Sequence, residues 1–340
     1  MRRAVLSSCL AVGLLALSGG ARANDTTAAL EAGGLIFVRN ENVEMRSEDL
    51  FISEKEVRVS YLFHSTAEKD TTVLVAFPMP DIILVEQDVA MPNPASPNFL
   101  DFVTKVDGKP VETKVEQRVI SFGLDQTKVL TDLNVPLNPR QRETFAVLDA
   151  LPTDKQQTLL ERGLVRVEEY DAGKGMERHL TPLWTLRTTF YWMQTFPAKK
   201  DLKVEHRYTP SVGMAVGTIL GSEMKGEPGF VNLIKAQRDK YCVEPALMAS
   251  LQKATREAQK QDRLAYSEAF IGYVLKTGGN WQGPITDFTL TIDKGAPENI
   301  LSFCGTGVKK IGPTTFQVKA KDFWPENDLE ILILKPYPKK

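Results

Sequence analysis

Short runs in which apolar and polar residues alternate recur along most of this chain. Within 56–64, every second residue from Val57 to Phe63 is apolar. The same period returns in three later segments: 184–192, 202–208 and 287–292. A period of two places successive side chains on opposite faces of a strand. The sequence therefore predicts a mainly β fold whose strands bury one face.

Two long stretches of such strands flank a helical segment. Thr153 and Gln156 have the spacing of a capping box, and Gly163 is typical of a helix C-terminus. A chain of 340 residues is long enough for two domains. We therefore expect two antiparallel, immunoglobulin-like β-sandwich domains joined by a short helix. The expected boundaries are 24–150 for the N-terminal sandwich, 151–170 for the junction helix and 171–340 for the second sandwich.

The first unit contains the signals of two hairpins. One joins a strand over 57–63 to a buried strand over 72–77, across a polar turn. The other joins 102–106 to 111–119 across Asp107-Gly108, which supplies the positive φ angles of a tight turn. Two further segments are expected: a loose arm of small and polar residues over 24–33, and a strand over 129–135 that is closed by Pro136 and Pro139.

The second unit is interrupted by a helical insertion near 231–261. Val243, Leu247 and Leu251 lie four residues apart among polar neighbours, which is the period of an amphipathic helix. Pro245 is tolerated only in a first turn, so a helix boundary is expected near Glu244. The second sandwich therefore carries at least one helix on its surface.

Residues 1–23 have the three parts of a secretory signal peptide. Arg2 and Arg3 precede an apolar run from Ala4 to Leu17, and Ala21-Arg22-Ala23 is a cleavage site of small residues. The run is shorter than the roughly 20 residues that span a bilayer. We expect cleavage before Asn24, no remaining membrane segment, and a periplasmic location, with full secretion as the alternative. A lipidation box ending at Cys9 is disfavoured because a long hydrophobic stretch follows it.

Cleavage changes the charge and the cysteine count. It removes three arginines and no acid from 42 basic and 43 acidic residues, which leaves a net charge of −4. No basic excess remains to neutralise phosphates, so nucleic acid is not an expected partner. Cys242 and Cys304 become the one possible pair, and in an exported protein we expect them to form a disulfide. The alternative is two buried free thiols.

Recognisable catalytic motifs are missing from the sequence. His64, His179 and His206 are far apart and lack the spacing of a zinc site. His206 shares an apolar strand face and is expected in the core, bonded to a backbone carbonyl. His64 is expected to be solvated, and His179 to lie in a loop. No nucleophile elbow or phosphate-binding loop is present, so we assign no catalytic, cofactor-binding or metal-binding residue and expect no cofactor.

Aromatic and acidic residues gather in one segment near the C-terminus. Asp322, Phe323, Trp324 and Glu326 form a candidate ligand or partner surface, because sugar sites combine aromatic platforms with acids. Trp281 is a further candidate aromatic of such a surface. The alternatives are a loop whose aromatics close the end of the sandwich, and core packing for Trp281.

Several motifs resemble a family of exported bacterial proteins that is catalogued as domain of unknown function 4424. They are spread over the mature chain: 44–53, Val73 to Pro80, Phe196-Pro197-Ala198, His206-Arg207-Tyr208, Tyr241-Cys242 and Thr277 to Ile285. The resemblance implies export and one family architecture. It implies no activity.

The sequence thus favours an exported, non-catalytic binding or structural protein of the bacterial cell envelope. It would act through sandwich loops or edges on an envelope protein or a glycan. Two alternatives stay open. One is an enzyme on envelope glycans that uses Asp322 and Glu326, and the other is a carrier of a small ligand between or inside the sandwiches.

Overall fold

The computed structural model describes residues 26–31, 34–84, 88–171, 173, 175–223 and 226–338. The expected signal peptide lies outside the described residues. Strands make up 45% and helices 19% of the described residues, so the mainly β prediction is confirmed. Among the described residues, no helix is both long and apolar enough to cross a membrane.

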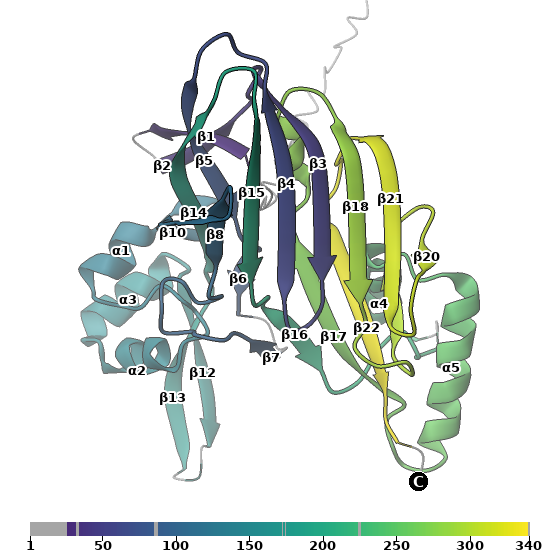
Figure 1. The fold of residues 1–340 in the computed structure, drawn as a ribbon. Helices are drawn as coiled ribbons and strands as arrows, with labels where there is room; N and C mark the ends of the chain where they lie inside the picture. The colour runs from purple at the N-terminus through teal and green to yellow at the C-terminus, as the bar shows by residue number, and fades with distance from the viewer. Residues whose placement is uncertain are drawn as a thin grey trace, which may run out of the picture.

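One layer of the fold is an eight-stranded sheet (Figure 1). Its strands follow the order β20-β21-β18-β3-β4-β15-β8-β9. Their bounds are β3 (Val43–Ile52), β4 (Val57–Ser65), β8 (Val103–Val106), β9 (Lys109–Val111), β15 (Asp201–Tyr208), β18 (Ile285–Asp293), β20 (Lys309–Lys310) and β21 (Thr315–Phe323). Five strands come from the first half of the sequence or its middle, and three come from the C-terminal part.

Two smaller sheets lie behind this layer (Figure 1). The seven-stranded sheet contains β1 (Thr26–Glu31), β2 (Gly34–Val38), β5 (Thr71–Pro78), β6 (Ile82–Ile83), β10 (Lys114–Ser121), β11 (Leu124–Asp125) and β14 (Thr185–Phe196). The five-stranded sheet contains β7 (Asp88–Ala90), β16 (Val212–Ala215), β17 (Tyr266–Tyr273), β19 (Ile300–Phe303) and β22 (Leu329–Pro336). The fold is therefore one large sheet packed on two.

A single hydrophobic core joins all three sheets. Phe63 of the large sheet, Phe196 of the seven-stranded sheet and Ile331 of the five-stranded sheet belong to the same buried cluster. In addition, β3 pairs in parallel with β18, with Leu50 opposite Leu290. The two separate antiparallel sandwiches are therefore not confirmed. Alternation predicts a strand and its buried face, but the partner strand can lie anywhere in the chain.

One of the two expected hairpins is present in part, because most of its predicted second strand over 111–119 is β10, which pairs with β14 in the seven-stranded sheet. β8 and β9 pair across Asp107-Gly108, whose φ angles are 47° and 76°. The predicted hairpin of β4 with β5 is wrong. β4 pairs with β3 and β15, while β5 pairs with β1 and β14. The polar segment after β4 crosses between layers instead of turning back within one sheet.

Two segments of the first unit differ from their predictions. The expected arm contains β1, which pairs with β2 and β5. The expected strand over 129–135 is helical, since α1 spans Thr127–Asp132. A short apolar run does not distinguish a strand from one buried turn of helix, and Leu130 alone of the α1 side chains is buried.

A small lobe of helices follows. It contains α1, α2 (Arg142–Ala150), α3 (Thr153–Glu161) and the hairpin of β12 (Val165–Asp171) with β13 (Met176–Pro182). The helix expected in this segment is present as α3, and Gly163 after it has φ 63°. The predicted capping box is wrong, because the N-cap residue is Pro152. Gln156 Nε2 instead donates to preceding backbone carbonyls, including those of Asp149 and Leu151.

The helical insertion is confirmed as two helices, α4 (Pro228–Lys240) and α5 (Pro245–Gln259). They cover the outer face of the five-stranded sheet, where Leu251 packs in one cluster with Leu332 and Leu334. A short 3₁₀ helix, η1 (Lys276–Asn280), follows β17. The predicted disulfide is also present: Cys242 and Cys304 are bonded, with their Cα atoms 5.0 Å apart. It joins the link between α4 and α5 to the end of β19.

Candidate functional site

The structure places Trp281 away from any surface. Its side chain is fully buried. The ring centroid lies 4.6 Å from that of Phe63 and 5.8 Å from that of Phe196. Trp281 therefore fills the core between two sheets, and it is removed from the predicted binding surface.

The other four residues of that predicted surface lie together at the end of β21 and in the loop after it. Asp322 and Glu326 are exposed, and Trp324 is 50% exposed. Phe323 instead stacks on Phe288, with ring centroids 4.3 Å apart. Three side chains are thus available to a ligand, and their role stays a prediction.

Each histidine takes part in a structural contact. His206 is buried in the core as expected, and its Nδ1 lies 2.9 Å from Thr104 Oγ1. His64 is not simply solvated, because its Nδ1 lies 2.6 Å from Asp201 Oδ1. His179 lies in β13 and not in a loop, with Nδ1 2.7 Å from Asp149 Oδ2. In the part of the chain that the structure describes, no group of three His, Cys, Asp or Glu could hold a metal ion.

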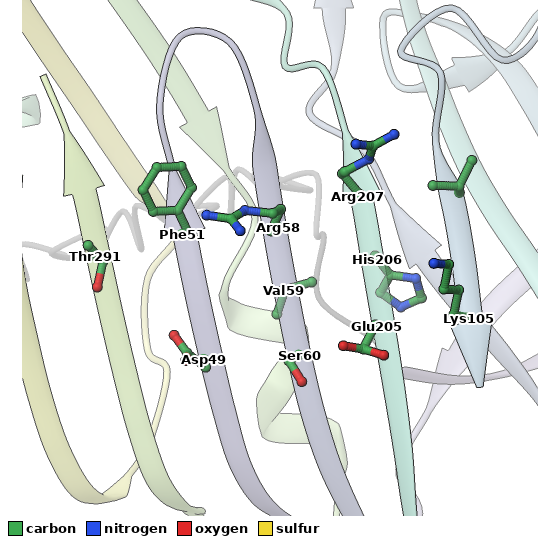
Figure 2. Close-up of a pocket in the computed structure, with 11 residues that line it drawn as sticks. Asp49, Phe51, Arg58, Val59, Ser60, Lys105, Glu205, His206, Arg207 and Thr291 are labelled. Carbon is green, nitrogen blue, oxygen red and sulfur yellow. The ribbon is translucent and has the colours of Figure 1, made fainter. Parts of the chain in front are cut away.

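The outer face of the eight-stranded sheet contains a hollow of about 590 Å³ (Figure 2). We call it the outer groove. Its lining comes from five strands: β3, β4, β8, β15 and β18. The outward residues of these strands stand in two rows, because residues opposite each other in register lie side by side across a sheet. The groove therefore depends on strands from distant parts of the sequence.

The first row consists of Asp49, Ser60, Glu205 and Lys105, each opposite the next. At about 4.8 Å between strands, it extends over about 14 Å. Lys203 Nζ donates to Glu205 Oε1 at 2.7 Å. Among the described residues, the side chains of Asp49, Ser60 and Lys105 make no hydrogen bond or ion pair. This row therefore offers a carboxylate, a hydroxyl and an ammonium to a ligand.

The second row consists of Thr291, Phe51, Arg58, Arg207 and Val103, each opposite the next. The Arg58 guanidinium lies 4.5 Å above the centroid of the Phe51 ring, a cation–π arrangement that fixes its plane. Figure 2 shows the two side chains together. The ring thus supports the cation and is covered by it.

Arg58 and Arg207 share one carboxylate. Arg58 Nε lies 2.9 Å from Glu56 Oε2, and Arg207 Nη1 lies 3.7 Å from Glu56 Oε1. The Arg207 side chain is 68% exposed. Each guanidinium has five N–H donors, so both retain donors that point to solvent. Two guanidiniums against one carboxylate leave a positive charge beside Lys105, and this end of the groove suits a carboxylate or a phosphate.

Sequence reasoning missed the outer groove. The alternation in 56–64 and 202–208 places Arg58, Ser60, Glu205 and Arg207 on polar strand faces. The same alternation does not say that these two strands are neighbours, and it says nothing of β3 and β8. The missing information was the strand order.

Comparison with known protein families identifies the family of this chain. The model of a domain of unknown function, DUF4424, matches residues 23–332. The chain belongs to the DUF4424 family. The motifs that suggested this membership lie throughout the matched range, so the expected resemblance is confirmed. No curated protein matches this DUF4424 chain.

A solved structure from Legionella pneumophila, provisionally called a nutrient binding protein, is similar to the DUF4424 chain at 14% identity. The match covers 92% of this chain and 71% of that chain, with a TM-score of 0.44. At this identity and TM-score, the likeness establishes neither a shared fold nor a shared ligand.

Proposed function

We propose that this DUF4424 protein is a non-catalytic binding protein of the bacterial cell envelope, and that its partner lies in the outer groove. The observation that carries the proposal is the pair of rows on the large sheet. They present Asp49, Ser60 and Lys105 without partners among the described residues, beside two guanidiniums that share one carboxylate. Solvent-facing polar groups held on rigid strands are pre-organised for binding.

The groove chemistry favours an acidic glycan. Arg58, Arg207 and Lys105 suit carboxylates, while Asp49 and Ser60 suit hydroxyl groups. The open, shallow form of a sheet face suits an extended chain better than a compact molecule. A row of about 14 Å gives room for more than one sugar.

The envelope location rests on the sequence. Residues 1–23 have the composition of a signal peptide, and Cys242–Cys304 is a disulfide of the kind that persists in oxidising compartments. Fractionation of cells that produce the full-length chain tests this part. We expect a periplasmic protein whose measured mass is that of a chain starting at Asn24. A cytoplasmic protein that retains residues 1–23 would contradict it.

Calorimetry with two tetrasaccharides tests the binding proposal. One is built of uronic acids, and the other is neutral and of equal length. We expect the acidic probe to bind, with an affinity that falls as salt is added. Arg58→Gln and Arg207→Gln should each weaken it about tenfold, since a hydrogen bond to a charged group contributes about 1.5–3 kcal/mol.

Lys319→Gln is the matched control. Lys319 projects from the same sheet face opposite Thr289 and is exposed, but it does not line the groove. This variant should bind like the wild type. Equal binding of the acidic and neutral probes, or full affinity in both arginine variants, would contradict the proposal.

A glycan hydrolase is the second candidate. It is favoured by the half-exposed Trp324, which lies between the exposed residues Asp322 and Glu326 in the sequence. Hydrolysis of envelope glycan by the wild type that is lost in Asp322→Ala or Glu326→Ala would support this candidate. Hydrolysis unchanged in both variants would remove these residues from it.

A further inference from the structure

A second hollow, of about 520 Å³, lies where the seven-stranded and five-stranded sheets meet. We call it the seam crevice. One wall is the segment from Pro80 to Ile83, which leads from β5 into β6, and the other is formed by β17 and the start of β22. Arg140 and Lys240 line it from the helical lobe and from the end of α4. Its volume is within the range of small-molecule sites.

Two glycines shape the crevice. A Cβ atom at Gly213 would lie 1.7 Å from the Phe270 ring, so the ring occupies the space that a side chain would need there. A Cβ atom at Gly272 would lie 3.8 Å from Glu330 Oε2 and 3.9 Å from Pro80 Cβ. A single added carbon would therefore touch both walls without a clash. The missing side chain at Gly272 therefore leaves the gap between the two walls open.

Carboxyl groups come from both walls. The Asp81 carboxylate accepts from Arg187 Nε at 3.4 Å, and Glu330 Oε2 lies 3.2 Å from Lys240 Nζ. A third carboxylate, Asp328, accepts from the backbone amides of Leu275 and Lys276. The lining thus holds three acids and two cations, Arg140 and Lys240, and Arg187 adds a third cation that pairs with Asp81 from outside the lining.

Burial makes these carboxylates receptive to a further cation. Desolvation is the main cause that raises the pKa of Asp81, against the lowering effect of Arg187. Desolvation also raises the pKa of Glu330, with Lys240 opposing it and Asp328 reinforcing it. The present cations therefore do not compensate the loss of water around either carboxylate. Apolar surface is provided beside them by Ile83, Val89 and Phe270.

We propose that the seam crevice binds a small ligand with a primary ammonium group on an apolar body. The ammonium would lie over Gly272, within reach of Glu330 and on the side of Asp81, and the apolar body would lie against Phe270 and Ile83. An ammonium has three donors and suits two carboxylates at once. This site is separate from the outer groove and shares none of its lining residues.

Three probes with the same phenyl body separate the possible ligand charges. Phenethylamine carries the ammonium alone, 3-phenylpropionate carries a carboxylate alone, and phenylalanine carries both. Titration of the mature, disulfide-bonded chain should give binding of phenethylamine, and at least tenfold weaker binding of 3-phenylpropionate. Binding of phenylalanine as tight as that of phenethylamine also supports the proposal, with Lys240 or Arg140 taking the carboxylate.

Variants at two positions place the ligand in the crevice by independent means. Glu330→Gln removes a charge and should weaken phenethylamine binding about tenfold. Gly272→Val adds bulk between the walls and should abolish binding, whereas Gly272→Ala, which adds one methyl group, should weaken it less and keeps the test valid if the valine variant fails to fold.

Arg207→Gln, in the outer groove, is the control and should bind phenethylamine like the wild type. Because Arg207 lines only the outer groove, this control distinguishes a failure of the crevice proposal from a failure of the groove proposal. Equal binding of amine and acid, no binding of any probe, or full affinity in both Glu330→Gln and Gly272→Ala would overturn the inference.

Discussion

The disulfide allows a prediction whose size follows from the chain itself. Cys242 and Cys304 are 62 residues apart in the sequence. Cross-linking them restricts the unfolded chain, and the loop-closure relation for a loop of this length gives roughly 4 kcal/mol at 25 °C. We therefore expect the double variant Cys242→Ser/Cys304→Ser to lose roughly 4 kcal/mol of unfolding free energy.

Equilibrium unfolding in urea measures this loss. Wild-type protein treated with a reductant is an internal control, because it should unfold like the double variant. The bridge also lies two residues after Lys240, which lines the seam crevice, so phenethylamine binding should weaken along with stability. A loss below about 1 kcal/mol would refute the reasoning, since the link would then constrain little of the unfolded chain.

Further predictions concern the core and the buried carboxyl groups. Trp281→Ala should cost about 3–5 kcal/mol in urea unfolding because it opens a cavity, whereas Trp324→Ala should change stability by about 0.5 kcal/mol or less; similar losses would contradict the burial difference. Burial raises the pKa of Glu330, so its contribution is fully present below the ordinary pKa and is lost as pH rises through the raised folded value. The melting temperature of Glu330→Gln minus that of wild type should therefore increase from pH 4 to pH 7, and a constant or falling difference would count against this. Thr104→Val removes the hydroxyl beside buried His206 and should cost about 1–3 kcal/mol, while an unchanged unfolding curve would show that this contact contributes nothing.

Local signals predicted local structure well. The alternation around Tyr61 and around Val204 corresponds to β4 and β15, and Asp107-Gly108 forms the expected turn. The proline at 245 begins α5, and Cys242 and Cys304 are paired. Each of these depends on neighbours in sequence or, for the cysteines, on the expectation that Cys9 is removed with residues 1–23.

Strand order could not be predicted in the same way. β3 lies beside β18 although more than two hundred residues separate them, and β4 and β5 lie in different sheets. Apolar alternation is the same whichever strand is the neighbour. The prediction of two sandwich domains was not confirmed for this reason. The outer groove was missed for the same reason, because its two rows form only when β3, β4, β15 and β8 lie side by side in that order.

The burial of Trp281 was missed for a related reason. Its neighbours in sequence are glycines and polar residues, which is typical of an exposed turn. Its neighbours in space are Phe63 and Phe196, from two different sheets. An aromatic residue in a polar segment can fill a core formed by distant strands, and sequence alone does not distinguish this from a binding platform.

Protection of lysines from acylation tests the central claim most directly. Lys105 lines the outer groove, and Lys319 lies on the same sheet face outside it. Both are exposed, so one mass-spectrometric experiment compares them in the same molecule. We predict that the uronic-acid tetrasaccharide slows acylation of Lys105 and leaves Lys319 unchanged. Equal protection of both lysines, or protection of neither at saturating tetrasaccharide, would contradict a binding site in the outer groove.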